Sequence, residues 1–328
     1  MRLTDPFHPP PLIRNPHLQT VLCSSRIRAL RSNAMMQAAR ETILTTDGGV
    51  RLLGYHSAQS RRPARGLVIL LHGWEGSSDS VYIRRTGGTF YKRGYAVFRL
   101  NLRDHGGSHH LNAGLFYAAA IEEVHAAVGQ AAGLNPQIPA FLVGFSLGGN
   151  FALRIALRCR QEPIPNLKHV VGISPVLDPD DATDKIDSSG YILRYFLKKW
   201  RRSLRKKQAL FPHRYDFAAA LQLPSVRSVT EELLSNYSYY HSAKEYFNAY
   251  SLVGDALLDI CVPTTVLTAE DDPIIGVEQF HRLQLNAQTC LAVQPYGGHN
   301  GFISGFSFTG WYEKPMVDLF DETAGLGA

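Results

Sequence analysis

Short runs of apolar residues alternate with amphipathic segments along most of this chain, and this alternation constrains the fold more than any other feature of the sequence. The run "GLVILLHG" is almost continuously apolar and ends in turn residues, as expected of a strand buried on both faces of a parallel sheet. Alternating strands and helices predict an α/β fold, in which helices flank a mostly parallel central sheet. The expected strands cover residues 66–73, 95–103, 140–146, 169–176, 264–271 and 290–297.

A β-hairpin is expected before the first buried strand. Residues 39–57 form two alternating segments around "DGG", and Asp-Gly is typical of a tight hairpin turn. The first 35 residues are rich in proline and arginine, and we expect an irregular lead-in that packs on the outside of the domain. Amphipathic periodicity predicts helices over residues 82–94, 116–133, 147–159, 276–285 and 311–322.

The region from residue 179 to residue 253 interrupts the alternation. It is helical, aromatic and basic in character, and it stands between two expected sheet strands. An insertion at this place would lie over the carboxyl ends of the strands, where open α/β sheets bind their ligands. We therefore expect one core formed by residues 1–178 and 254–328, with 179–253 as a helical lid.

The charge of the chain is concentrated in one segment. The net charge is +6, but "KKWRRSLRKK" at residues 198–207 accounts for it, so the remaining residues are close to neutral. A nucleic-acid partner is therefore not expected. The four cysteines form no C-x-x-C pair, and no apolar window approaches the roughly 18 residues of a membrane span. These features favour a cytoplasmic protein, and the oligomeric state is left open.

The basic segment has a helical apolar face. Leu193, Phe196, Trp200 and Leu204 recur at helical spacing, with cations on the other side. One interpretation is a lid helix whose apolar face packs on the domain and whose basic face is solvated. The alternative is peripheral contact between this basic helix and an anionic membrane surface.

A candidate nucleophile lies where one strand gives way to a helix. Ser146 stands in "GFSLGG", with Gly144 two residues before it and Gly148 two residues after it. Glycines at these positions permit a strained turn that exposes a hydroxyl at the top of the sheet. The N-terminal end of the following helix favours an oxyanion nearby. We therefore expect Ser146 to act as a nucleophile.

A serine nucleophile needs a base and an acid, which on such a sheet follow in the order serine, acid, histidine. His299 lies in a glycine-flanked loop after the last expected strand, whereas His213, His241 and His281 lie in the lid or a helix. His299 is therefore the expected base. For the acid, the preceding strand ends in "EDDP", where we favour Asp272 because Pro273 stiffens its turn, with Asp271 as the alternative.

The oxyanion hole requires two main-chain N–H donors. We expect one from Leu147, directly after the nucleophile, and one from Trp74 in the loop "HGWEGSS". His72 is expected to brace this loop rather than to react. Glu75 is either a second brace or a surface residue.

A second cluster of polar residues raises the question of a metal. Asp104, His105, His109 and His110 lie within one loop, but their spacing lacks a zinc pattern. We expect no metal there, and interpret the loop as packing beside the site.

A series of motifs occurs in order over most of the chain: "RNPHLQT", "HGWEGSS", "RDHGGS", "GFSLGGN", "YFNAYS" before "VPTTVLTAEDDP", and "GGHNGF". On these motifs the sequence resembles the YheT-like branch of the α/β-hydrolases. The resemblance implies an α/β-hydrolase fold, hydrolysis of carboxylic esters without a metal or organic cofactor, and Ser146, Asp272 and His299 at the triad positions. It does not imply a particular substrate. Membrane-anchored relatives carry an N-terminal hydrophobic segment that is not found here, so the expected comparison is with the soluble bacterial type.

The leading hypothesis is a serine ester hydrolase that acts on a small-molecule ester or a lipid with an apolar acyl chain. An acyltransferase using the same triad is one alternative. A catalytically inactive ligand-binding protein on the same scaffold is another.

Overall fold

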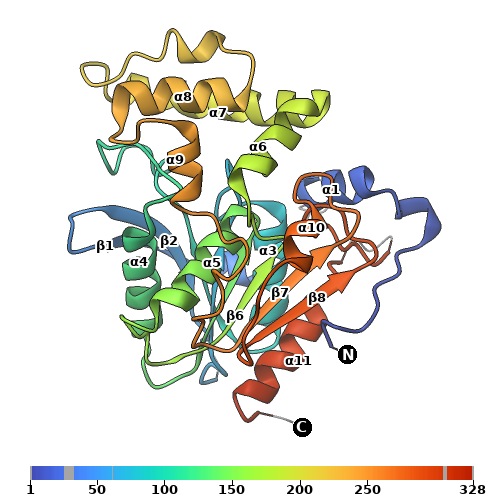
Figure 1. Ribbon diagram of the computed structural model, residues 1–328. Coiled ribbons are helices and arrows are strands. Elements are labelled where there is room, and N and C mark those ends of the chain that lie inside the picture. Colours follow the sequence, from blue (N-terminus) through green and yellow to red (C-terminus); the bar gives the residue numbers. More distant parts are fainter. Residues whose placement is uncertain (1, 26–32, 61, 306–308, 327–328) are drawn as a thin grey trace.

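The computed structural model describes residues 2–25, 33–60, 62–305 and 309–326, and it contains an eight-stranded sheet (Figure 1). The strand order is β1-β2-β4-β3-β5-β6-β7-β8. β2 pairs antiparallel with β1 and β4, and the pairs from β4 to β8 are parallel. The strands are β1 (Ala39–Thr45), β2 (Arg51–Ser57), β3 (Leu67–Leu71), β4 (Ala96–Leu100), β5 (Ala140–Phe145), β6 (Leu167–Ile173), β7 (Thr264–Ala269) and β8 (Thr289–Gln294).

Helices cover both faces of the sheet, and the expected α/β fold class is confirmed (Figure 1). The core helices and the N-terminal segments are η1 (Pro11–Ile13), α1 (Pro16–Ser24), α2 (Ala34–Gln37), α3 (Val81–Lys92), α4 (Ile121–Gly133), α5 (Leu147–Arg158), α10 (Val277–His281) and α11 (Glu313–Thr323).

The central strands are apolar throughout because both of their faces are buried. Side chains alternate across a strand, so Leu67 and Ile69 of β3 join a cluster with α4 and α5. Val68 and Leu70 of the same strand join a second cluster with α3 and α11. The continuous apolar runs in the sequence are the consequence of this arrangement.

The residues between β6 and β7 form a helical layer above one end of the sheet (Figure 1). The two ends of this layer meet, because the Leu252 N–H donates to the Leu177 carbonyl at 2.7 Å. The side-chain amide of Asn150 in α5 donates to the carbonyls of Val176 and Tyr250, both at 2.8 Å. The layer is thus tied to the helix that follows Ser146. It consists of α6 (Pro179–Ser188), α7 (Gly190–Leu210), η3 (Ala220–Gln222), α8 (Val226–Tyr237) and α9 (Ala243–Asn248).

Two of the helix predictions were too long. α4 begins at Ile121 and not at Phe116. The buried guanidinium of Arg154 donates to the carbonyls of Ala118 and Ala119, which therefore accept bonds from outside the helix. The helix expected over residues 276–285 is α10, which ends at His281.

The prediction of an irregular lead-in was wrong for residues 16–24, which form α1. Asn15 caps this helix by accepting from the N–H groups of His17 and Leu18, and Pro16 occupies its first turn, where a missing N–H costs nothing. The sequence "NPHLQ" therefore contained a start signal for a helix. Within α1, Gln19 is fully buried against the core.

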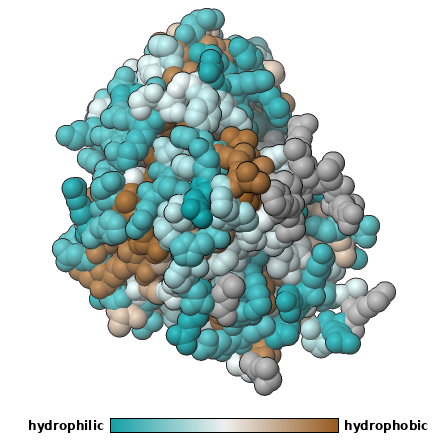
Figure 2. Space-filling view, turned by 90° about the vertical axis from the view of Figure 1, so that its right-hand side faces the viewer, coloured by the Kyte–Doolittle hydropathy of each residue, from teal (hydrophilic) through white to brown (hydrophobic). Residues whose placement is uncertain are grey.

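The face on the side of α1 and β8 is mainly hydrophilic, with hydrophobic side chains in small separate patches (Figure 2). Among the helices of the described ranges, none combines the length and the hydrophobicity needed to cross a bilayer.

Candidate active site

Ser146 occupies the sharp turn between β5 and α5. Its backbone has φ 55° and ψ −118°, in the left-handed half of the map that non-glycine residues rarely adopt. Neighbouring backbone approaches closely: a Cβ on Gly144 would lie 2.0 Å from the Gly148 carbonyl oxygen, and one on Gly148 would lie 2.5 Å from the Leu71 oxygen. Glycine at both positions therefore allows the turn that carries the serine.

The structure brings His299 and Asp272 into a hydrogen-bonded chain with Ser146. His299 Nε2 lies 2.8 Å from Ser146 Oγ, and His299 Nδ1 lies 2.9 Å from Asp272 Oδ2. With a proton on Nδ1, the ring donates to the carboxylate and Nε2 accepts from the serine hydroxyl. This arrangement lets the imidazole remove a proton from Ser146.

The two adjacent aspartates have different partners. Asp272 Oδ1 accepts from the N–H groups of Ile274 and Ile275 at 2.8 and 3.0 Å, which fixes its carboxylate toward His299. Asp271 Oδ1 instead accepts from the main-chain N–H of Gly298 at 2.8 Å and not from the imidazole ring of His299. The geometry thus favours Asp272 over Asp271 as the partner of His299.

Helix α1 supports the loop that carries His299, a contact that the sequence reasoning missed. Thr20 Oγ1 accepts from the His299 N–H at 2.9 Å. The buried Gln19 side chain accepts from the Ile303 N–H at 2.7 Å and donates to the Ile303 carbonyl at 3.3 Å. The available signal was the motif "RNPHLQT", which spans the start of α1 and is one of the motifs on which the resemblance rests.

The loop expected to complete an oxyanion hole lies beside the serine. A Cβ on Gly73 would lie 3.1 Å from Ser146 Cβ, so the main chain at Gly73 lies against the nucleophile, and Trp74 is the next residue in the chain. Leu147 is the first residue of α5. Within the described part of the chain, no hydrogen bond takes the main-chain N–H of Trp74 or Leu147. Both donors are therefore free to bind an oxyanion.

His72 braces this loop, as the sequence suggested. Its Nδ1 lies 2.8 Å from the Gly73 carbonyl oxygen, and its Nε2 accepts from the Leu102 N–H at 3.2 Å. Complete burial lowers the pKa of His72 well below its usual value, so the ring is neutral and suited to this pair of bonds.

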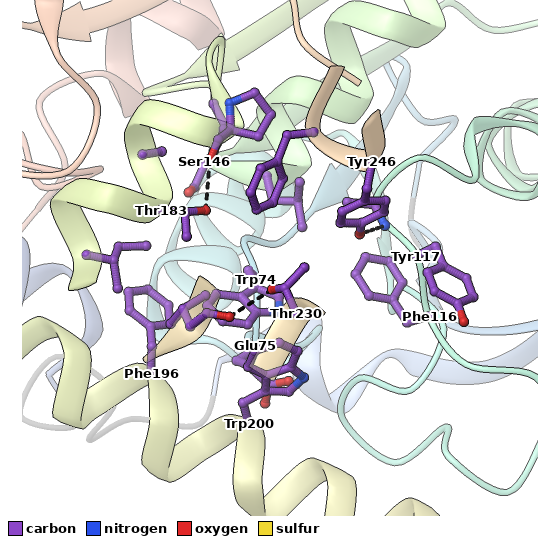
Figure 3. A pocket seen from close by; sticks show the side chains of 18 of the residues that line it. Trp74, Glu75, Phe116, Tyr117, Ser146, Thr183, Phe196, Trp200, Thr230 and Tyr246 are labelled. Atoms are coloured by element: carbon purple, nitrogen blue, oxygen red, sulfur yellow. Dashed lines mark hydrogen bonds between the residues drawn. The ribbon is translucent and has the colours of Figure 1, made fainter. Parts of the chain in front are cut away.

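An apolar cavity extends from Ser146 and His299 beneath the helical layer. Trp74 stacks on Phe196 at a centroid distance of 5.1 Å and meets Trp200 edge-on at 5.0 Å. Figure 3 shows these rings on one side of the cavity, with Phe116, Tyr117 and Tyr246 across from them. Further lining residues come from the helical layer and from the loop after Asp272, namely Ala182, Ile186, Val226, Leu233, Ile274 and Ile275.

A buried ion pair joins α7 to the loop before α4. Lys207 Nζ lies 2.7 Å from Asp104 Oδ1 and donates to the carbonyls of Asn112 and Gly114 at 2.8 and 2.9 Å. Lys207 is only 1% exposed, so it does not belong to a solvated basic face as the sequence suggested. Arg103 pairs with Glu123 and not with Asp104. In the described ranges, no group of three or more His, Cys, Asp or Glu side chains is arranged to hold a metal ion.

Glu75, next to Trp74, also lines the apolar cavity and adopts a left-handed φ of 54°. Burial raises the pKa of Glu75 to about 7, although Lys199 and Arg202 oppose the shift. The folded protein therefore binds a proton at this carboxyl that the unfolded chain has already released above pH 4.5. Stability contributed by the protonated form is lost as pH rises from 4.5 towards 7.

We expect Glu75→Gln to stabilise the protein at pH 8 by about 1 kcal/mol and to have much less effect at pH 5. Thermal unfolding at both pH values measures the difference, which corresponds to roughly 2 °C in Tm. The exposed Glu231→Gln serves as the control. An equal Tm change at the two pH values would contradict the assignment of the shift to Glu75.

Comparison with known proteins gives one family and several relatives. The family described as serine aminopeptidase, S33, matches residues 62–300. YheT of Escherichia coli strain K12, which bears the name of a proposed esterase, is 25% identical over 89% of this chain and 85% of its own. Phospholipase ABHD3 of Bos taurus is 23% identical over 90% of this chain and 75% of its own.

A solved structure shows the same architecture. The esterase Pf2001 of Pyrococcus furiosus matches with a TM-score of 0.54 and 20% identity, over 87% of this chain and 89% of that one. At this level of identity, the similarity concerns the fold.

Proposed function

The chain belongs to the α/β-hydrolase family described as serine aminopeptidase, S33, and we propose that it is a serine hydrolase that cleaves carboxylic esters of apolar acyl chains. The expected resemblance to the YheT-like branch is confirmed by the match over most of both chains. One observation carries the proposal: the hydrogen-bonded chain Asp272–His299–Ser146 opens directly on an apolar cavity.

In the proposed reaction, Ser146 Oγ attacks the ester carbonyl while His299 Nε2 takes its proton. The negative oxygen of the tetrahedral intermediate accepts from the N–H groups of Leu147 and Trp74. The C–O bond then breaks, and His299 returns the proton to the departing alcohol. Water, activated by the same ring, releases the acid from the acyl-enzyme.

The acyl group of the substrate is assigned to the apolar cavity. Aromatic and aliphatic side chains line it, and burial of a hydrocarbon chain there contributes about 0.8 kcal/mol per methylene. The relative named as a phospholipase supports a lipid or another ester with a hydrocarbon chain.

A substrate panel tests this proposal against its rivals. It compares p-nitrophenyl esters from acetyl to dodecanoyl, acyl thioesters, lysophospholipids and aminoacyl amides, because the family name refers to an aminopeptidase. We expect ester turnover that rises with chain length. Faster turnover of the aminoacyl amides would overturn the ester assignment. Addition of alcohols or amines to the assay separates hydrolysis from acyl transfer by the product formed.

Narrowing the cavity tests where the acyl chain lies. Ala182 is buried in α6 and lines the apolar cavity, so Ala182→Leu is expected to lower kcat/KM for octanoyl esters by about 10-fold while acetyl esters change little. Ala219→Leu, at an exposed position in the same insertion, is the matched control. If Ala182→Leu affects acetyl and octanoyl esters equally, the acyl chain does not occupy this cavity.

A further inference from the structure

A second cavity meets the first one at the nucleophile. Ser146 and His299 line both cavities, as do Trp74, Phe196 and Ile274. Whereas the first is apolar, the second is lined, among the described residues, by four cations: Arg84 from α3 and Lys198, Lys199 and Arg202 from α7. We call this second cavity the cationic groove. The reacting carbonyl would therefore sit at the junction of an apolar and a cationic compartment.

Helix α7 separates the two compartments by its periodicity. Residues three or four apart share a helix face. Phe196, Trp200 and Leu204 follow this spacing and line the apolar cavity. Lys198, Lys199 and Arg202 lie on the adjacent face and line the groove together with Tyr195. The same helix thus presents hydrocarbon to one side of Ser146 and positive charge to the other.

The positive charge of the groove is largely uncompensated. Within the described ranges, none of its four cations forms an ion pair with a carboxylate. Among the described residues that line the groove, Asp79 is the one acid, and its carboxylate pairs with Arg99 at 3.0 Å. The Lys199 ammonium donates to the Tyr195 hydroxyl at 3.2 Å and lies over the face of that ring.

One further carboxyl faces these cations from the apolar cavity. Glu75 interacts electrostatically with Lys199 and Arg202, but its own pKa is raised to about 7 by burial. It therefore carries a full negative charge only at alkaline pH. Four cations against one partly protonated acid leave the groove suited to an anion.

We propose that the cationic groove binds an anionic group, a phosphate or a carboxylate, on the alcohol side of the ester whose acyl chain fills the apolar cavity. This inference deepens the proposed function and rests on it. In an ester, the acyl chain and the alcohol are attached to opposite sides of the reacting carbonyl carbon. An acyl chain in one compartment therefore directs the alcohol into the other. Lysine and arginine bind phosphate oxygens through charge-assisted hydrogen bonds.

A matched pair of substrates tests the proposal. 1-Octanoylglycerol and 1-octanoylglycerol 3-phosphate differ only in the anionic group. We expect the double variant K198Q/R202Q to lower kcat/KM for the phosphate ester by about 10-fold or more, and to change the neutral ester by less than about 2-fold. Raising the ionic strength should slow turnover of the phosphate ester alone.

Helix α7 also offers a control variant, which removes two positive charges outside the groove. Arg194 and Arg205 are exposed in α7 and line neither cavity. R194Q/R205Q should therefore leave both esters within about 2-fold of the wild-type rate. If both double variants slow the phosphate ester equally, the effect is one of overall charge and the proposal is wrong. The proposal is also wrong if K198Q/R202Q slows both esters to the same extent.

Binding measurements separate this inference from the proposed function. Calorimetry with Ser146→Ala needs no turnover, and we expect 1-octanoylglycerol 3-phosphate to bind at least about 10-fold more weakly when K198Q/R202Q is added. Inorganic phosphate alone, as an inhibitor of neutral-ester turnover, shows whether the groove takes a free anion or only an attached headgroup. Binding of a free phosphate and binding of an attached headgroup alone would each support an anion site in the groove.

An anionic membrane surface is the competing explanation for the basic helix. Cosedimentation with phosphatidylserine vesicles tests this explanation. If K198Q/R202Q and R194Q/R205Q weaken vesicle binding equally, and neither double variant changes the relative kcat/KM of the two soluble esters, α7 binds a membrane and the proposal is overturned. The wild type could also fail to hydrolyse either ester and still bind 1-octanoylglycerol 3-phosphate through Lys198 and Arg202. That result would reject the proposed ester hydrolase and retain the anion site.

Discussion

Replacing Ser146 with alanine is expected to lower kcat for p-nitrophenyl octanoate by about 10⁴-fold or more, because the acyl-enzyme can no longer form. The folded structure should persist, since within the described ranges the Ser146 side chain forms its one hydrogen bond with His299. Steady-state kinetics and the Tm of the purified variant measure the two effects. Ser188→Ala, at an exposed position that lines neither cavity, should leave both unchanged. Residual turnover within 10-fold of wild type in Ser146→Ala would exclude the serine as the nucleophile.

The second large effect is expected from Asp272→Asn, at about 10⁴-fold in kcat. An asparagine at this position can present an N–H to the ring, which favours the tautomer in which Nε2 carries the proton and cannot accept from Ser146. Fluorescence and Tm should change little, since the substitution is nearly isosteric.

Asp271→Asn is the matched control for that variant. Its side-chain oxygen can still accept from the Gly298 N–H, the bond that Asp271 makes in the structure. We therefore expect a loss of less than about 10-fold in kcat. Reversed effects of the two substitutions would assign the acid to Asp271 instead.

The candidate triad could be anticipated because each of its members follows a strand of the parallel part of the sheet. Ser146 comes directly after β5, Asp272 shortly after β7, and His299 after β8. The carboxyl ends of parallel strands share one edge of the sheet, so chain order and strand pattern suffice to bring these residues near one another. The glycines around Ser146 add the local geometry of the turn.

The choice between the two aspartates could not be made in the same way. Both follow the same strand, and their directions depend on main-chain donors within the loop. The N–H groups of Ile274 and Ile275 turn Asp272 toward the histidine, whereas the Gly298 N–H holds Asp271. Such bonds arise only when the loop has its final shape.

Contacts between distant segments account for the other differences. The late start of α4 depends on Arg154, and the burial of Lys207 depends on Asp104 and two carbonyls across the chain. Helical periodicity describes which side of a helix is polar, but not whether another segment supplies partners for a buried charge. The role of α1 beneath the His299 loop has the same origin.

Phosphonylation tests the central claim most directly, namely that His299 activates the Ser146 hydroxyl. Wild-type protein is treated with a fluorophosphonate, and the modified peptide is identified by mass spectrometry. We predict one phosphonyl group per chain, on Ser146, with labelling slowed by at least about 10³-fold in His299→Ala. Labelling of a different serine, or equal labelling rates with and without the His299 ring, would contradict the claim.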